Sequence, residues 1–282
     1  APSEVSTGHP ALPQHAAPAI CAPAARAGAG AALGIGSGDE VILPTFTIIS
    51  CAAAIVRAGA APVVVDADPL TWNMDVAQVE RRIGPRTKAI MVVHIYGLPV
   101  DMAAIEALAE RHSLAIIEDA AEMHGQTYRG RPCGSFGAIS TFSFYPNKHV
   151  TTGEGGMLVT DSDDLAERCR SLRNLAFKPP RRFVHDELGW NLRMTSMQAA
   201  LGVAQLERLD GFVERKRAMG RRYTQGLAGV RGVQLPLPRN ADAENIYWVY
   251  GLVLDDDVGF DAEEAMRRLA EAGVGCRPFF WP

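Results

Sequence analysis

Lysine is scarce in this chain of 282 residues, and the scarcity narrows its chemistry. Only four of the 28 basic residues are lysine, so arginine serves almost everywhere that positive charge alone is needed. Arginine cannot condense with an aldehyde, whereas a lysine amine can. Each lysine is therefore a candidate for amine chemistry, and the four are Lys88, Lys148, Lys178 and Lys216.

Other features are absent, and each absence excludes a class of protein. The five cysteines show no CxxC or metal-ligand spacing, and HExxH and GxSxG are missing, so no disulfide framework, metal site or serine triad is predicted. No apolar run reaches the roughly 18 residues of a membrane span. A formal net charge of −4 leaves no basic excess for nucleic acid. We expect a cytoplasmic protein with reduced thiols that acts on small molecules.

The order of apolar runs predicts an α/β fold. From Asp39 onward short runs such as VILP, PVVVD, KAIMVV, LAIIED, AISTFSF and GMLVT alternate with helical patterns, the rhythm of a mostly parallel sheet with crossover helices. Several runs are apolar at successive positions, as strands covered on both faces should be. The glycines of GIGSGDEV precede a strand instead of following one, which argues against a dinucleotide loop.

We expect three segments along the chain. Residues 1–30 are rich in Ala, Pro and Gly and are predicted to be poorly structured, with little chemistry. Residues 31–209 should form the large domain. Residues 210–282 should supply a linker helix and a partial small α/β lobe, with a strand at YWVYGLVL, a helix at 262–272 and the start of another strand at GVGCRPFFWP.

Two residues suggest pyridoxal phosphate chemistry. Asp119 ends the strand LAIIED, and the carboxyl ends of strands are where open α/β sheets bind ligands. Lys148 lies in the turn after AISTFSF, beside Ser143 and the glycines of TTGEGG. A lysine forms a Schiff base with the cofactor aldehyde, and a carboxylate keeps the pyridine ring protonated. Taken alone, Asp119 is more typical of a helix cap or a loop residue, and Lys148 of a surface lysine. Together they favour a pyridoxal phosphate site.

With these residues assembled, the chain from about Leu33 resembles the DegT/DnrJ/EryC sugar aminotransferase family. The likeness rests on GIGSGDEVILPTFT, PVVVDADPLTWNMD, VHIYGLPVDM, IIEDAAEMHG, SFYPNKHVTTGEGGM and GWNLRMTSMQAALG. It implies the pyridoxal phosphate-dependent transferase fold, of the aspartate aminotransferase-like fold type I. Within the family the chain is most similar to enzymes that aminate a GDP-linked 4-keto-6-deoxymannose.

The resemblance also implies residue roles. Lys148 would bind the cofactor covalently and carry protons, Asp119 would meet the ring nitrogen, and Glu122 would lie near the phenolic oxygen. Ser143 would hold the phosphate, and Ile48 would pack the ring face where many relatives have an aromatic side chain. A further set completes the expected site: Asn191 reaching the phosphate of a neighbouring subunit, and His185, Arg193 and Arg277 as either substrate contacts or structural residues.

The implied reaction is amino transfer from L-glutamate to a nucleotide-linked 4-keto-6-deoxy sugar, with a GDP-sugar favoured. Related dehydratases have histidine at the position of Lys148, so lysine favours amino transfer. The role of Asn191 implies a homodimer with shared active sites.

The sequence departs from the family pattern at both ends. AICAPAARAGAGAA stands where relatives have a Gly-Thr step that binds the cofactor phosphate at a helix start, and the chain stops at RPFFWP. We expect a chain truncated at both ends, by origin a gene fragment or a reading frame disrupted before Leu33. The alternative to an active enzyme is therefore an inactive aminotransferase-like scaffold or partner subunit.

Overall fold

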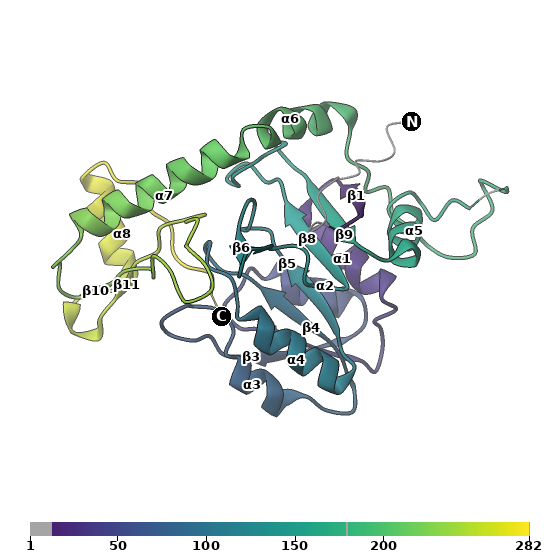
Figure 1. The fold of residues 1–282 in the computed structure, drawn as a ribbon, viewed down its shortest axis with the longest axis horizontal. Coiled ribbons are helices and arrows are strands. Elements are labelled where there is room, and N and C mark those ends of the chain that lie inside the picture. Colours follow the sequence, from purple (N-terminus) through teal and green to yellow (C-terminus); the bar gives the residue numbers. More distant parts are fainter. Residues whose placement is uncertain (1–12, 179, 282) are drawn as a thin grey trace.

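A seven-stranded sheet forms the centre of the protein in the computed structural model, which describes residues 13–178 and 180–281 (Figure 1). The strand order is β1-β9-β8-β5-β4-β2-β3. These strands are β1 (His15–Ala19), β2 (Glu40–Pro44), β3 (Ala61–Val65), β4 (Thr87–Val93), β5 (Ala115–Asp119), β8 (Ile139–Ser143) and β9 (Gly156–Thr160).

Most of the sheet is parallel, as the sequence predicts. β2 pairs in parallel with β3 and β4, β4 with β5, and β5 with β8, whereas β9 and β1 complete one edge in antiparallel pairing. The carboxyl ends of β4, β5 and β8 therefore meet at the same edge of the sheet. A short hairpin of β6 (Thr127–Tyr128) and β7 (Arg131–Pro132) lies between β5 and β8 in the chain.

Helices cover both faces of the sheet. One apolar cluster joins it to α1 (Ala22–Ala32), α2 (Ser50–Arg57) and α5 (Asp163–Leu172), and a second joins it to α3 (Val76–Arg82) and α4 (Met102–His112). Capping side chains fix where several helices begin: Asp75 accepts a hydrogen bond from the Ala77 N–H at 2.9 Å, and Ser162 accepts one from the Leu165 N–H at 3.3 Å.

The expectation that residues 1–30 are poorly structured is wrong for the part that the structure describes. β1 pairs with β9 from His15 opposite Thr160 to Ala19 opposite Gly156, and α1 follows directly. Alanine suits α1 because the helix must pack tightly on the sheet, and Ala25 and Ala29 are fully buried. Residues 1–12 lie outside the described residues.

α1 also approaches β9 so closely that only glycine fits at residue 156. A Cβ atom there would lie 2.5 Å from the Cys21 carbonyl oxygen and 2.8 Å from the Ala22 nitrogen. The start of α1 is thus held against the strand that follows the Lys148 loop. An apparently featureless N-terminal segment is part of the sheet and of its core.

The C-terminal part contains α6 (Ser196–Leu206), the long helix α7 (Leu209–Gly226), strands β10 (Val233–Gln234) and β11 (Val253–Leu254), the 3₁₀ turn Asp256–Val258 and α8 (Ala262–Glu271). α7 leads away from the sheet to α8, β10 and β11 (Figure 1). A long helix is therefore present at the start of the predicted C-terminal segment, and its role as a linker stays a prediction. The division of the chain at residues 30 and 209 stays a prediction.

Two strand predictions in this part are wrong. Of YWVYGLVL, only Val253–Leu254 is a strand, and residues 274–281 form none. Instead the Ile246 N–H donates to the Gly97 carbonyl at 3.2 Å, and Tyr247 takes a positive φ of 46°. Contacts with the loop after β4 have overridden the strand propensity of this aromatic segment.

None of the helices that the structure describes is both long and apolar enough to cross a membrane.

Candidate active site

Asp119 ends β5 and is almost completely buried. Its Oδ1 accepts a hydrogen bond from the Ala121 N–H at 3.1 Å, and its Oδ2 accepts one from the Cys51 thiol at 3.3 Å and an ion-paired one from Arg26 Nε. Burial alone would raise the pKa of Asp119, but the charge and hydrogen bond of Arg26 hold it below the ordinary value. Asp119 is therefore a carboxylate at neutral pH.

Arg26 is the main site residue that the sequence did not reveal. It is the only charged residue of α1, it is 4% exposed, and its Nη1 also donates to Ser50 Oγ at 3.1 Å. Burial would lower the pKa of Arg26, but Asp119, with smaller effects of Cys51 and Glu122, reverses that shift and raises it. The sequence contained one signal. An arginine in a helix otherwise made of Ala, Gly and Pro needs an acidic partner if its face of the helix is buried.

Lys148 lies in the turn after β8, with its side chain inside the protein. Its backbone N–H donates to the Tyr145 carbonyl at 3.0 Å, which fixes the turn. Nζ is 3.6 Å from Glu122 Oε1 and 3.6 Å from the centre of the Trp248 ring. Burial lowers the pKa of Lys148, while the negative charges of Glu122 and Asp119 oppose the shift. The amine is thus poised to react as a nucleophile nearer neutral pH than a surface lysine.

Glu122 links Lys148 to the loop after β4. Its Oε2 accepts a hydrogen bond from the Tyr96 N–H at 2.7 Å. Burial raises the pKa of Glu122 to about 7, even though Lys148 and this hydrogen bond favour the carboxylate. Burial and Glu122 together raise the pKa of the Tyr96 phenol to about 12. Glu122 can therefore hold or release a proton beside Lys148 near neutral pH.

We predict that Glu122→Gln lowers the pKa of Lys148 further, because the substitution removes a negative charge that favours the ammonium form. Lysine reacts when neutral, so the midpoint of its reactivity should move to lower pH. The measurement is the rate of pyridoxal phosphate attachment to Lys148, trapped with borohydride, as a function of pH. Glu106→Gln, which changes an exposed pair with Arg131, should leave the midpoint in place. An unchanged or higher midpoint in Glu122→Gln would refute this assignment.

Aromatic side chains from the C-terminal segment line the site beside Lys148. Trp248 Nε1 donates to the Asn147 carbonyl at 2.9 Å, and its ring stacks on Phe280 at 6.3 Å between centres. The Arg277 guanidinium lies 5.1 Å from the Trp248 ring, and its charge acts on Glu122. The structure thus brings the predicted residue Arg277 to the site, together with aromatic residues that the sequence did not single out.

Some buried polar atoms on and beside β8 have no hydrogen-bond partner in the part of the chain that the structure describes, and could meet a polar ligand. Thr141 Oγ1 and both ring nitrogens of His124 have no hydrogen-bond partner among the described residues. Burial lowers the pKa of His124 to about 3, so its ring is neutral. Ser143, two residues after Thr141 on β8, accepts only a long hydrogen bond of 3.4 Å from the Tyr145 N–H. Buried groups normally have partners, so Thr141 Oγ1 and Ser143 Oγ, on one face of β8, are consistent with a bound phosphate-bearing cofactor. His124 packs against Phe142 and Phe144 on the opposite face and is not assigned to the cofactor.

Four predicted site residues form no hydrogen bond or ion pair with Lys148, Asp119 or Glu122 in the described part of this single chain. Asn191 and Arg193 are exposed and bonded to each other, with Arg193 Nη2 donating to Asn191 Oδ1 at 3.0 Å. The His185 ring pairs with the Leu175 carbonyl at 2.9 Å. Ile48, just before α2, is partly exposed. Their roles toward cofactor and substrate stay predictions.

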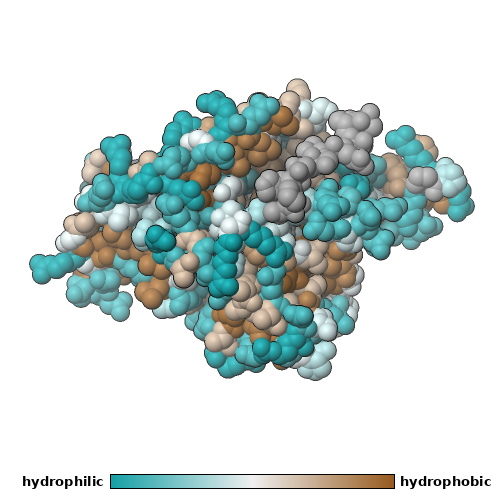
Figure 2. Space-filling view, in the orientation of Figure 1, coloured by the Kyte–Doolittle hydropathy of each residue, from teal (hydrophilic) through white to brown (hydrophobic). Residues whose placement is uncertain are grey.

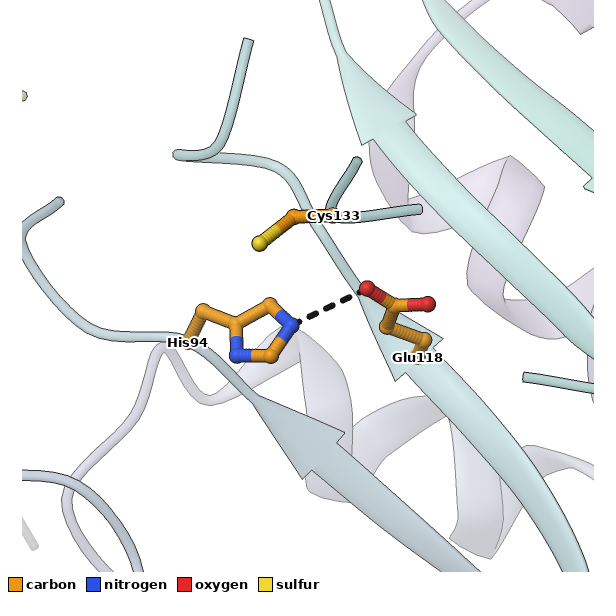
Figure 3. Close-up of side chains that lie close together, drawn as sticks. All are labelled: His94, Glu118 and Cys133. Carbon is orange, nitrogen blue, oxygen red and sulfur yellow. Dashed lines mark hydrogen bonds and ion pairs between the residues drawn. The ribbon is translucent and has the colours of Figure 1, made fainter. Parts of the chain in front are cut away.

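A second buried cluster of His94, Glu118 and Cys133 is structural (Figure 3). His94 Nδ1 accepts the Val100 N–H at 3.1 Å, so Nε2 carries the proton that it shares with Glu118 Oε1 at 3.0 Å. Glu118 also accepts hydrogen bonds from the backbone N–H groups of three residues and from one hydroxyl: Gly134, Phe136, Gly137 and Ser140. The donor atoms of His94 and Glu118 that a metal would need are thus already engaged within the protein.

Comparison with solved structures defines the class of protein. The chain matches the structure of the aminotransferase TlmJ from Streptoalloteichus hindustanus with a TM-score of 0.89 and 35% identity, covering 95% of this chain and 72% of that one. It matches the PLP-form of Spr1654 from Streptococcus pneumoniae with a TM-score of 0.87 and 26% identity, covering 95% and 73%. The fold is that of a pyridoxal phosphate-dependent aminotransferase of fold type I.

The particular family follows from the sequence comparisons. Residues 15–282 match the model of the DegT/DnrJ/EryC1/StrS aminotransferase family. A relative from Caulobacter vibrioides, GDP-perosamine synthase, is 45% identical over 252 residues, which cover 89% of this chain and 68% of the relative. The chain belongs to the DegT/DnrJ/EryC1/StrS aminotransferase family, and pyridoxal phosphate is its cofactor.

Proposed function

We propose that this protein transfers an amino group from L-glutamate to the keto carbon of a GDP-linked 4-keto-6-deoxy sugar. The observation that carries the proposal is 45% identity to the GDP-perosamine synthase of Caulobacter vibrioides across 89% of the chain. The buried pairing of Lys148 with Glu122, next to Asp119, supports an active enzyme. No finding favours the alternative of an inactive scaffold.

The residues of the site suit the parts of the cofactor. Lys148 would hold it covalently, Asp119 would face the ring nitrogen, Glu122 would lie near the phenolic oxygen, Ser143 would hold the phosphate, and Ile48 would pack the ring. When bound, pyridoxal phosphate supplies an electron sink that stabilises negative charge on the carbon bearing the transferred nitrogen.

The protein's own task is to move protons and exclude water. The lowered pKa of Lys148 lets its amine accept a proton, and Glu122, whose pKa is raised to about 7, can exchange one with it at the 3.6 Å pair. Trp248 stacks on Phe280 beside Lys148, so one side of the site is apolar ring surface, which does not hydrogen-bond water. Arg277, positioned against Trp248, can attract the phosphates of a nucleotide sugar.

The test is transfer of isotope from ¹⁵N-glutamate. With GDP-4-keto-6-deoxymannose and added pyridoxal phosphate, we expect the purified protein to form an amino sugar that carries ¹⁵N. Replacing glutamate with ¹⁵N-aspartate measures the specificity for the amino donor. Replacing the GDP-sugar with UDP- or dTDP-linked keto sugars measures the specificity for the acceptor. Transfer to another nucleotide sugar alone would overturn the GDP preference. The absence of transfer to every sugar, with cofactor bound, would overturn the proposed reaction.

We also propose a homodimer formed through α6. This helix exposes Met197, Leu201 and Val203, with Met197 79% exposed. Figure 2 shows hydrophobic residues along the upper part of the molecule, where Figure 1 places α6. Exposed apolar faces of this kind support an interface. Asn191 and Arg193 lie just before α6, which supports their reaching a neighbouring active site.

We predict that Leu201→Asp converts a dimer to a monomer, because it places a charge on an apolar contact surface. Sedimentation velocity over a range of protein concentrations is the measurement. Leu70→Asp is the matched control, since Leu70 is similarly exposed but lies outside α6. A dimer that survives Leu201→Asp, or a parent protein that is monomeric at every concentration, would contradict the proposed interface.

Finally, we propose that the protein works in the cytoplasm. All five cysteines lie among the described residues and none forms a disulfide there, as expected of a reducing compartment.

A further inference from the structure

Arg26 places a positive charge, in addition to that of Lys148, near Asp119, the carboxylate that we expect to face the ring nitrogen of the cofactor. Arg26 is the only charged residue of α1. α1 packs on the face of the sheet opposite to α4, so the Arg26 side chain reaches Asp119 from that face. A buried arginine needs a partner, and among the described residues its ion pair is with Asp119. The pair is therefore part of the active site and not of the surface.

Two hydrogen bonds hold the Arg26 guanidinium in place, and a third fixes the Asp119 carboxylate that it pairs with. Nε pairs with Asp119 Oδ2, and Nη1 donates to Ser50 Oγ at 3.1 Å. The Cys51 thiol donates to the same Oδ2 at 3.3 Å, and burial raises its pKa to about 12, so it stays a neutral donor. Ser50 and Cys51 both belong to the first turn of α2. The guanidinium thus bridges Ser50 of α2 and Asp119 of β5, and moving it would leave these polar groups without a partner.

Asp119 is already paired with a basic side chain before any cofactor binds. Arg26 lies beside Asp119, whereas Lys148 lies beside Glu122, so each of the two carboxyl groups faces one basic side chain. A pyridinium nitrogen is stabilised by an opposite charge and destabilised by a like charge. Here it would meet a carboxylate already neutralised by a guanidinium.

We propose that Arg26 is a positioning residue that shares Asp119 with the ring nitrogen of pyridoxal phosphate, so that the ring is less protonated and less tightly held than by an unshared aspartate. The inference rests on the cofactor assignment but not on the identity of the sugar. Arg26 touches Asp119 and not the reacting atoms, so its effect reaches the ring through the carboxylate. A less protonated ring is a weaker electron sink.

The experiment compares Arg26→Met and Arg26→Gln with the parent protein. Each variant removes the charge, and glutamine keeps a neutral donor for Asp119. With ¹⁵N-labelled pyridoxal phosphate, the ¹⁵N chemical shift of the bound ring reports its protonation directly. Equilibrium dialysis gives the dissociation constant. We expect the ring to shift toward the pyridinium in both variants, and the dissociation constant to fall about tenfold, as one unit of pKa implies.

Arg26→Lys keeps the charge and is the control, for which we expect a ¹⁵N shift close to that of the parent. Arg26→Met leaves Asp119 unpaired in the core, so pyridoxal phosphate should raise its melting temperature more than that of the parent. If Arg26→Met does not fold, Arg26→Gln carries the comparison. Identical ¹⁵N shifts and dissociation constants in all proteins would overturn the role of Arg26 alone. Failure of every protein to bind the cofactor would overturn the cofactor assignment as well.

Discussion

Replacing Lys148 with arginine should reduce amino transfer by roughly 10³-fold or more, because proton transfer by a positioned side chain alone contributes about 10² to 10⁴. Arginine keeps the positive charge beside Glu122, but it can neither bind the cofactor covalently nor accept a proton at neutral pH. The measurement is the rate of ¹⁵N transfer from glutamate to the sugar.

Lys88→Arg is the matched control for this variant. Lys88 is exposed on β4, and the substitution should leave the rate unchanged. Circular dichroism and thermal unfolding of both variants separate chemistry from folding. A Lys148→Arg protein that keeps its fold and more than a tenth of the parent rate would show that another residue carries the reaction.

Glu118→Ala should reduce the free energy of unfolding by about 3–5 kcal/mol, the cost of breaking a buried charged network by removing one partner. The side chain of Glu118 is fully buried and holds His94 and several backbone N–H groups, all of which would lose their acceptor. Domains are stable by only roughly 5–15 kcal/mol, so the loss is large. Denaturant titration at neutral pH is the measurement.

The pH dependence gives this prediction a second readout. Burial would raise the pKa of Glu118, but His94 and the backbone N–H groups lower it below its ordinary value of 4.5. A depressed folded pKa means that the stabilisation is complete above pH 4.5 and is lost as the pH falls toward the folded pKa. The parent and Glu118→Ala should therefore differ most near neutrality and converge in acid.

The control for the loss of a carboxylate is Glu106→Ala. Glu106 pairs with Arg131 at 2.8 Å on the surface, where such pairs contribute at most about 1 kcal/mol. Equal losses in Glu106→Ala and Glu118→Ala would contradict the assignment of Glu118 to a structural network.

Much of the sheet was predictable from the sequence because its central strands are buried on both faces. β2 and β4 contain apolar residues that are buried at successive positions. The same expectation is wrong for the VVV run of β3, which is an edge strand and leaves Val64 exposed. The segment at residues 247–252 was not predictable, because its conformation depends on distant contacts. Gly97 has a φ of 106°, and a Cβ atom there would lie 2.5 Å from the Tyr247 nitrogen. No pattern in the neighbouring sequence indicates this close contact between Gly97 and Tyr247.

The site was predictable only in part. Lys148 and Asp119 could be found because a lone lysine and a strand-end carboxylate are chemically distinctive. Glu118 and Asp119 are neighbours that point to opposite faces of β5, and only the structure shows which one holds the core together. Arg26 was missed because the composition of its segment suggested disorder, whereas tight packing on the sheet explains the same alanines and glycines.

The most direct test of the central claim is borohydride reduction of the protein with pyridoxal phosphate, followed by peptide mapping. We predict a single pyridoxyl label on Lys148, removed when L-glutamate is added before reduction. A folded protein that carries no label, or carries it on Lys88, Lys178 or Lys216, would contradict the assignment of Lys148 and the enzymatic function built on it.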